Sequence, residues 1–334
     1  MAKRDVDAHN GLTMRVQLPR RRSRTLTATL LAAATAASAA GASALPTWQR
    51  AAPLPDPRGE VAAAVVGGEI AVVGGFDRSG LDSARVDAYS PAREAWRRLS
   101  DLPAPVDHAM AAAAGRRLYV IGGYGRSRAP RRSAWVLASA GRWRALPPLP
   151  AARAAGGAAV LRGRLYVVGG VGPRGLARAM FVLDLRRSPS RWSSLPGPTP
   201  RQHLAVTAAG GRLYALAGRT AGFDTNTTLF ESFAPLERRW RRLPPVPAKR
   251  GGTGAAAVRT TIVSVGGEAP QGTIATVYGF DVVRRRWRRL PDLPTPRHGL
   301  AVAAVAGRVY AIAGGTTPGL ATSGANEFLP ISVR

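Results

Sequence analysis

A tryptophan that recurs at nearly constant spacing is the feature that most constrains the fold of this chain. It stands at six positions, 47 to 49 residues apart: Trp48, Trp96, Trp143, Trp192, Trp240 and Trp287. A pair made of a small residue and glycine recurs with the same period: Gly74-Gly75, Gly122-Gly123, Gly169-Gly170, Ala217-Gly218, Gly266-Gly267 and Ala313-Gly314. Two independent markers with one period indicate stacked repeats, because a single unit of this size cannot bury a core alone.

Each unit has the pattern of four short strands. A run of small apolar residues, as at 61–66 and 301–306, is followed by a glycine turn and a second apolar strand that ends at the glycine pair. A variable loop and a third strand come next, and the tryptophan opens the fourth strand. The alanine runs favour helix by propensity, but each is cut after about eight residues, which is too short for a stable helix. Glycine turns between such runs indicate a sheet.

The order of glycine pair, aromatic residue and tryptophan, at close to 50 residues per unit, resembles the Kelch repeat. The resemblance covers essentially the whole chain after residue 45, with departures such as Val106, where the other units open with arginine. It implies an all-β fold, a six-bladed propeller with four antiparallel strands per blade over residues 45–334. Small side chains then suit the innermost strands, where blades converge, and the tryptophans fill the wider wedges between outer strands.

The two ends of the repeat region predict how the ring closes. The last unit, from Arg297 onward, has no tryptophan, whereas the chain has an unassigned one at Trp48. The simplest solution is that a strand around Trp48 completes the sixth blade beside a strand near 327–331. This closure hides sheet edges that would otherwise be open to aggregation.

Residues 1–44 have the layout of a secretory signal peptide. A basic segment at 20–24 precedes an uncharged, alanine-rich stretch at 26–40, and Ala42-Ser43-Ala44 fits a cleavage site. The apolar stretch is too short for a membrane span, so we expect export to a periplasm, cell envelope or exterior. A start at Met14, a twin-arginine signal at Arg21-Arg22 and a basic disordered arm remain alternatives.

Composition argues against several chemistries. The chain has 334 residues and no cysteine, which excludes disulfides, thiolate metal sites and the tyrosine–cysteine cofactor of copper-radical oxidases that share Kelch repeats. The histidines have no recognisable metal-ligand spacing, and no catalytic motif is present. We therefore predict no catalytic residues, no metal and no cofactor.

The net charge of +29 is almost all arginine, which suits an acidic partner or a merely basic surface. Nucleic acid is disfavoured because the aromatics are committed to repeat positions.

The residues that open the inner strands form a candidate ring at the channel mouth. Five are arginines, namely Arg58, Arg153, Arg201, Arg250 and Arg297. Residues two positions further on share a face with them in an extended strand, which adds Glu60, His108 and His203. The ring could bind an anionic ligand, or the arginines could bond to loop carbonyls as part of the repeat. Asp107 and His298 follow opening residues directly and are expected to point elsewhere.

Together these patterns predict an exported, monomeric, non-catalytic protein that binds a glycan or a protein partner, possibly acidic. Recognition is expected at the channel mouth and at variable loops, such as the basic loop 124–133 and the polar loop 224–228. The alternative is a sugar-modifying enzyme resembling the sialic-acid mutarotase propellers. Such an enzyme would use Glu60, His108 and His203 as its acid/base groups.

Overall fold

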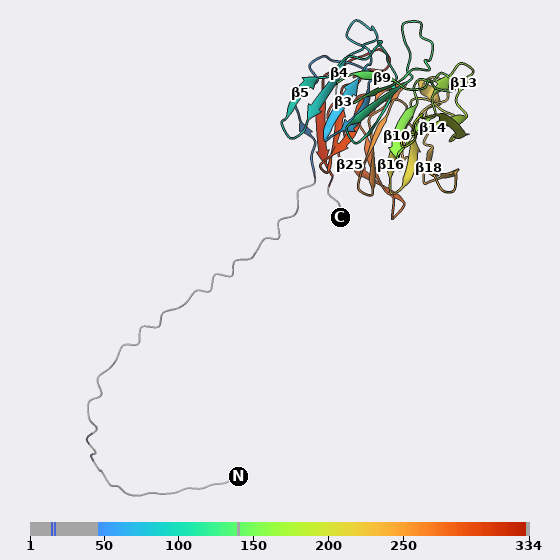
Figure 1. The fold of residues 1–334 in the computed structure, drawn as a ribbon. Helices are drawn as coiled ribbons and strands as arrows, with labels where there is room; N and C mark the ends of the chain where they lie inside the picture. Colours follow the sequence, from blue (N-terminus) through green and yellow to red (C-terminus); the bar gives the residue numbers. More distant parts are fainter. Residues whose placement is uncertain (1–14, 16, 18–45, 139–140, 332–334) are drawn as a thin grey trace. The chain divides into compact units, whose positions relative to one another are not determined.

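The structure of this protein is a computed structural model that describes residues 15, 17, 46–138 and 141–331. The predicted signal peptide at 1–44 therefore lies outside the described residues, apart from two isolated positions. Six four-stranded antiparallel sheets form a ring (Figure 1), which confirms the predicted six-bladed propeller. Within the described part of the chain, no helix is long and apolar enough to cross a membrane.

The four strands of a blade follow one another from the axis outward. The first blade contains β2 (Ala62–Val66), β3 (Glu69–Val73), β4 (Val86–Ser90) and β5 (Ala95–Arg98), and the second contains β6 (Met110–Ala114), β7 (Arg117–Ile121), β8 (Ala134–Leu137) and β9 (Trp143–Ala145). The third contains β10 (Gly157–Leu161), β11 (Arg164–Val168), β14 (Ala179–Asp184) and β15 (Trp192–Pro196), and the fourth contains β16 (Ala205–Ala209), β17 (Arg212–Leu216), β18 (Phe230–Ala234) and β19 (Arg239–Arg242).

The fifth blade follows the same plan, and the sixth draws on both ends of the chain. The fifth contains β20 (Gly254–Val258), β21 (Thr261–Val265), β24 (Val277–Asp281) and β25 (Arg286–Leu290). The sixth contains β26 (Ala301–Val305), β27 (Arg308–Ile312), β28 (Asn326–Pro330) and β1 (Gln49–Arg50). Between the second and third strands of blades 3 to 5 lie the hairpins β12 (Val171–Gly172) with β13 (Gly175–Leu176) and β22 (Glu268–Ala269) with β23 (Gly272–Thr273), and the 3-10 turn η1 (Phe223–Thr225).

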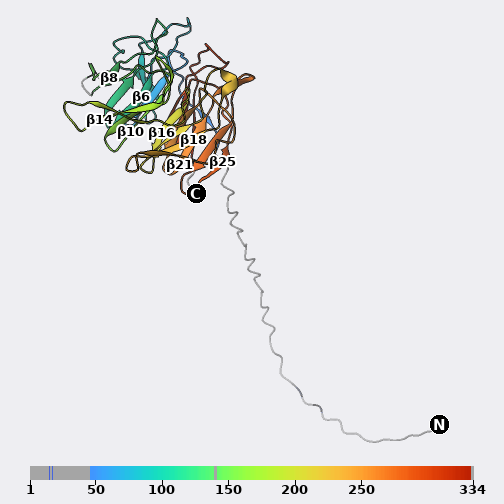
Figure 2. The ribbon, with the colours of Figure 1, turned by 90° about the vertical axis from the view of Figure 1, so that its right-hand side faces the viewer.

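Strand β1 closes the ring as the sequence predicts. It pairs antiparallel with β28, with Gln49 opposite Phe328 and Arg50 opposite Glu327. In Figures 1 and 2 the first strands, in blue, accordingly lie beside the last ones, in red. The sixth sheet therefore has four strands like the other five, one of them from the beginning of the repeat region and three from its end.

The hydrophobic core is divided into six clusters, each between two neighbouring blades. Alanines of the inner strands, such as Ala64 and Ala303, are buried near the axis, where the sheets converge. Larger rings fill the space further out, for example Tyr89 and Tyr310, whose ring centroids lie 5.9 Å apart across the junction of the first and sixth blades. Each cluster needs both of its blades, because one sheet covers only one side of it.

The six repeated tryptophans link each blade to the one before it. Each indole Nε1 donates a hydrogen bond to a carbonyl at or after the end of the preceding blade's outermost strand. The pairs are Trp96 with Ala52, Trp143 with Ser100, Trp192 with Pro147, Trp240 with Pro196, Trp287 with Pro244 and Trp48 with Pro291, at 2.7–3.1 Å. The Trp48 bond completes this outer ring.

We expect Trp48→Ala to lower the free energy of unfolding by about 3 kcal/mol, because it removes a large half-buried ring and the last of these bonds. Chemical denaturation followed by fluorescence of the remaining tryptophans measures the change. Trp48→Phe, which keeps an aromatic ring but not the donor, should lose only about 1 kcal/mol. Equal losses in the two variants would contradict this account.

The second glycine of each pair has no room for a side chain. At Gly123, where φ is +93°, a Cβ would lie 2.3 Å from Val106 Cγ2 and 2.6 Å from Asp107 O. We expect Gly123→Ala to cost about 3 kcal/mol in unfolding free energy, from overpacking and the left-handed backbone together. Gly175→Ala is the matched control, since its φ is +88° but no atom lies within 4 Å of the new Cβ. The control should lose roughly 1 kcal/mol, and a loss as large as that of Gly123→Ala would exclude the steric explanation.

Candidate functional site

Six turns, one per blade, surround the central axis. The residue two positions after each opening residue has a left-handed backbone, with φ between 48° and 63°: Glu60, His108, Ala155, His203, Gly252 and Gly299. The sequence analysis assumed that alternation along an extended strand directs these residues to the channel mouth. Instead, a tight turn before the inner strand does so. The left-handed conformation costs a non-glycine residue roughly 1–2 kcal/mol, so Glu60, His108 and His203 occupy positions that suit glycine.

A closed ring of backbone hydrogen bonds joins these six turns. The N–H groups of His108, Ala155, His203, Gly252 and Gly299 each donate to the carbonyl of the equivalent residue one blade earlier, at 2.8–3.1 Å. Val61 N closes the ring by donating to Gly299 O at 3.1 Å. The side chains that point to the axis are thus held on a rigid frame with little freedom to separate.

The five predicted site arginines lie inside the blades and are at most 4% exposed. Each guanidinium donates to backbone carbonyls of its own blade, as Arg58 does to Gly74 O at 3.0 Å and to Arg85 O at 2.7 Å. Arg153, Arg201, Arg250 and Arg297 make the same kind of bond. To reach a ligand at the axis, these arginines would have to give up bonds that hold the blade together.

The arginines fall into two classes. Arg58, Arg201 and Arg297 form buried ion pairs with the third-strand carboxylates of Asp87, Glu231 and Glu327. Arg153 and Arg250 instead lie over aromatic rings, 4.6 Å from the centroid of Phe181 and 5.1 Å from that of Tyr278. Burial lowers the pKa of Arg153 and of Arg250 to about 10, so both remain cations at neutral pH.

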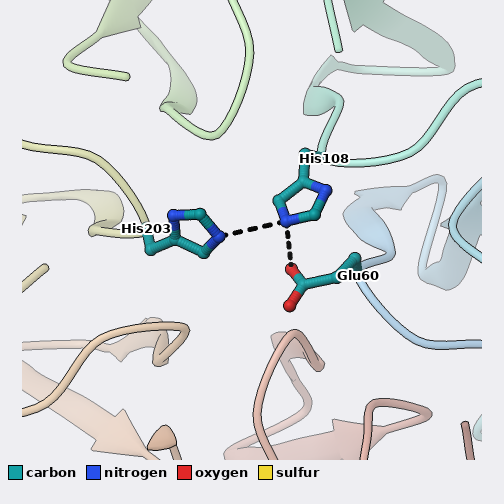
Figure 3. A group of neighbouring side chains, drawn as sticks. All are labelled: Glu60, His108 and His203. Atoms are coloured by element: carbon teal, nitrogen blue, oxygen red, sulfur yellow. Dashed lines mark hydrogen bonds and ion pairs between the residues drawn. The ribbon is translucent and has the colours of Figure 1, made fainter. Parts of the chain in front are cut away.

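The other three predicted site residues converge at the axis. Figure 3 shows Glu60, His108 and His203 pointing toward one another from three different blades. His108 Nε2 lies 3.0 Å from His203 Nε2 and 3.2 Å from Glu60 Oε2. The sequence spacing predicted no metal-ligand arrangement, yet the propeller brings two imidazoles and a carboxylate to within 4.8 Å of one another.

The expectation that Asp107 and His298 point elsewhere is wrong. His108 Nδ1 hydrogen-bonds with Asp107 Oδ1, and His298 Nδ1 lies 3.0 Å from Glu60 Oε1. Both residues support the cluster from its outer side. The error follows from the turn, because alternation of side chains between two faces holds only where the backbone is extended.

The charges of the cluster are set by burial and by close pairing. Burial lowers the pKa of His108, but the charge of Glu60 and the bond to Asp107 outweigh it, so this pKa lies above 6.5. Burial raises the pKa of Glu60, but the charge of His108 and the bond with His298 hold it below its usual range. For His203, burial and the positive charge of His108 both act to lower the pKa, which lies well below 6.5. Its Nδ1 is buried without a hydrogen-bond partner among the described residues.

A cavity of about 400 Å³ opens beside the cluster. Its other walls come from the loops that follow the glycine pairs: Phe76, Tyr124, Arg128, Arg219, Phe223, Glu268, Gly319 and Leu320. The Arg128 guanidinium lies 5.1 Å from the centroids of both Phe76 and Tyr124 and pairs with Asp107 at 2.8 Å. Larger hollows at the outer rim, one of about 700 Å³, are open wedges between blades that do not contain the histidines.

Most of these wall residues were not predicted from the sequence, although Tyr124 and Arg128 belong to the expected basic loop. A signal for them exists. The residue directly after each glycine pair differs between repeats. Its backbone forms a β-bridge with the residue that follows the opening residue of the same repeat, as Phe76 does with Gly59 and Arg219 does with Gln202. A variable position in an otherwise regular framework is where recognition is usually placed.

We expect Arg201→Leu to lower the free energy of unfolding by about 3–5 kcal/mol, because it leaves Glu231 buried without its counter-charge. Urea denaturation measures the loss, with the exposed Arg242→Leu as the control that should change little. Adding Glu231→Leu to Arg201→Leu should recover part of the loss. A stable Arg201→Leu protein would show that the arginine is not needed for the blade.

Comparison with known proteins agrees with this architecture. A family model, the KLHDC2/KLHL20/DRC7 Kelch-repeats domain, matches residues 60–246, which is more than half of the chain. The chain is also similar to the Kelch-like protein terF of Aspergillus terreus (strain NIH 2624 / FGSC A1156), with 29% identity over 118 residues. That match covers 32% of this chain and 26% of terF, so it spans about a quarter of the relative's length. On the family match and the six-bladed fold, this chain belongs to the Kelch-repeat family.

Proposed function

We propose that this chain is a non-catalytic binding protein that recognises a partner protein through the mouth pocket, the cavity beside Glu60, His108 and His203. Kelch domains generally mediate protein interactions. The observation that carries the proposal is that the variable loops of five blades meet around this one cavity. Loops that differ between repeats, held by a rigid frame, suit recognition of one partner.

The pocket has the chemistry of a protein-binding hot spot. Arginine and aromatic side chains, which are enriched at such sites, lie together as Arg128 with Phe76 and Tyr124 and as Arg219 with Phe223. At the rim, Leu320 is 72% exposed and offers an apolar contact. The net charge of +29 favours a partner with an acidic surface, since opposite charge speeds encounter.

A glycan ligand has less support from the pocket. Sugar recognition by aromatic residues uses a free ring face, but Arg128 and Arg219 lie over these rings. The enzyme alternative also lacks support, because the matches of this chain are to a Kelch-repeats domain and a Kelch-like protein and point to no catalytic activity. We also propose that the protein is exported and acts outside the cytoplasm. The support for export is the signal-peptide pattern of residues 20–44 alone.

The test compares two exposed leucines. Leu320→Asp places a charge at the pocket rim, and Leu236→Asp, at a position 84% exposed between β18 and β19, is the matched control. Proteins of the source organism are captured with the wild-type chain, and the affinity of the purified partner is then measured by calorimetry. We expect Leu320→Asp to weaken binding at least about tenfold, or about 1.4 kcal/mol, and Leu236→Asp to leave it unchanged.

The same experiment separates the alternatives. Equal weakening by the two leucine variants would contradict recognition at the pocket. A thermal shift with acidic glycans that is lost in Leu320→Asp, without any protein partner, would favour a glycan ligand instead.

A further inference from the structure

Two imidazole nitrogens face each other at the axis with a carboxylate beside them. His108 Nε2 lies 3.0 Å from His203 Nε2 and 3.2 Å from Glu60 Oε2 (Figure 3). Two such nitrogens either share a proton or bind a common cation through their lone pairs. Imidazole nitrogen and carboxylate oxygen are donors that Zn²⁺ accepts, whereas Ca²⁺ and Mg²⁺ take oxygen ligands.

The outer atoms of two of the three residues, His108 and Glu60, are held as metal ligands require, whereas His203 Nδ1 has no hydrogen-bond partner among the described residues. A metal-bound histidine almost always donates its other ring N–H to a carboxylate or carbonyl, which fixes the tautomer and aims the free nitrogen. His108 Nδ1 has Asp107 as this partner, and Asp107 is itself paired with Arg128 at 2.8 Å. Glu60 Oε1 is occupied by His298 Nδ1 at 3.0 Å, which leaves Oε2 for the axis.

A second group at the mouth also brings three donor residues together, but its donors are occupied. It comprises Glu60, Glu268 and His298. His298 uses both ring nitrogens, Nδ1 toward Glu60 and Nε2 to Thr317 O at 3.0 Å. Arg219 neutralises Glu268 at 2.7 Å, so this group is a hydrogen-bonded support for Glu60.

The geometry points to a Zn²⁺ site made of His108 Nε2, His203 Nε2 and Glu60 Oε2, with the fourth position open to the mouth pocket. Zn–N bonds of about 2.0–2.1 Å in a tetrahedron separate two nitrogens by about 3.3 Å, so the imidazoles need to part by only a few tenths of an ångström. Two histidines and one acidic residue with a free position is a known ligand set for zinc.

The site joins three blades at the axis. Glu60 belongs to the first blade, His108 to the second and His203 to the fourth, while the equivalent positions of the other blades carry only alanine or glycine. At Gly299 the Glu60 carboxylate occupies the place of the missing Cβ. The bound cation would stabilise the ring from within, and its open position would accept water or a donor atom of a ligand in the pocket. This inference does not depend on the proposed protein partner.

The test is zinc binding by the full chain, stripped of metal with a chelator. Titration with ZnCl₂ against a chromophoric chelator should give one ion per chain, and Co²⁺ should give the visible spectrum of a four-coordinate site. We expect His203→Ala to weaken zinc binding at least about a hundredfold and Asp107→Asn, which alters the support of His108, about 10- to 100-fold. His298→Gln, which alters the support of Glu60, should also weaken it about 10- to 100-fold, and Leu236→Asp, at an exposed position between β18 and β19, is the control that should leave it unchanged.

Folding of every variant is checked by circular dichroism and thermal unfolding, and His203→Gln replaces His203→Ala if the latter fails to fold. Weak binding of several ions by the wild-type chain, with no Co²⁺ spectrum, would show that a shared proton holds the two imidazoles. Zinc binding that survives both His203 variants but is lost in His298→Gln would place the ion in the second group and overturn the assignment. A partner-binding result of either sign leaves these outcomes unchanged.

Discussion

The closure of the ring is the constraint on which the rest of the structure depends. Each core cluster lies between two blades, so the cluster between the sixth and first blades has both of its sides only when the ring is closed. Strand β1 completes the sixth blade by pairing two residues with β28, and Leu54, a few residues later, packs into the cluster shared with the first blade. Trp48 adds a hydrogen bond to Pro291 of the fifth blade. Antiparallel pairing also removes the exposed edge that an open sixth sheet would present. The short segment 48–54 thereby completes the sixth blade and closes the ring.

The propeller is held by concentric rings of hydrogen bonds. The outer ring runs from tryptophan to carbonyl, and the inner one runs between the left-handed turns at the axis. Between them, the buried arginines tie five of the six inner turns to the strands of their own blades. Burying these arginines costs desolvation, which their hydrogen bonds to buried backbone carbonyls of the blade offset. Their recurrence in five blades reflects a shared backbone geometry.

The six turns at the axis share one backbone conformation but carry chemically different side chains. Six equivalent positions at the axis carry Glu60, His108 and His203 on three blades and only alanine or glycine on the others. The frame is the same, so the difference lies in the side chains alone. A rigid ring lowers the entropy cost of bringing ionisable groups together. Burial lowers the pKa of both histidines, but Glu60 and Asp107 outweigh it at His108, so the pKa of His108 is raised and that of His203 is lowered. The adjoining pocket makes this asymmetric centre accessible to a partner.

The sequence by itself determined the repeat, the blade count, the strand order within a blade and the closing strand, because the period of tryptophan and glycine is a local, one-dimensional signal. It also placed Glu60, His108 and His203 around one opening, although a left-handed turn and not the assumed alternation along a strand brings them there. Only the tertiary structure decided which way side chains point. Left-handed turns brought Asp107 and His298 into the cluster, and buried carbonyls drew the arginines away from the axis. Both outcomes depend on backbone dihedral angles and on partners distant along the chain, which periodicity does not encode.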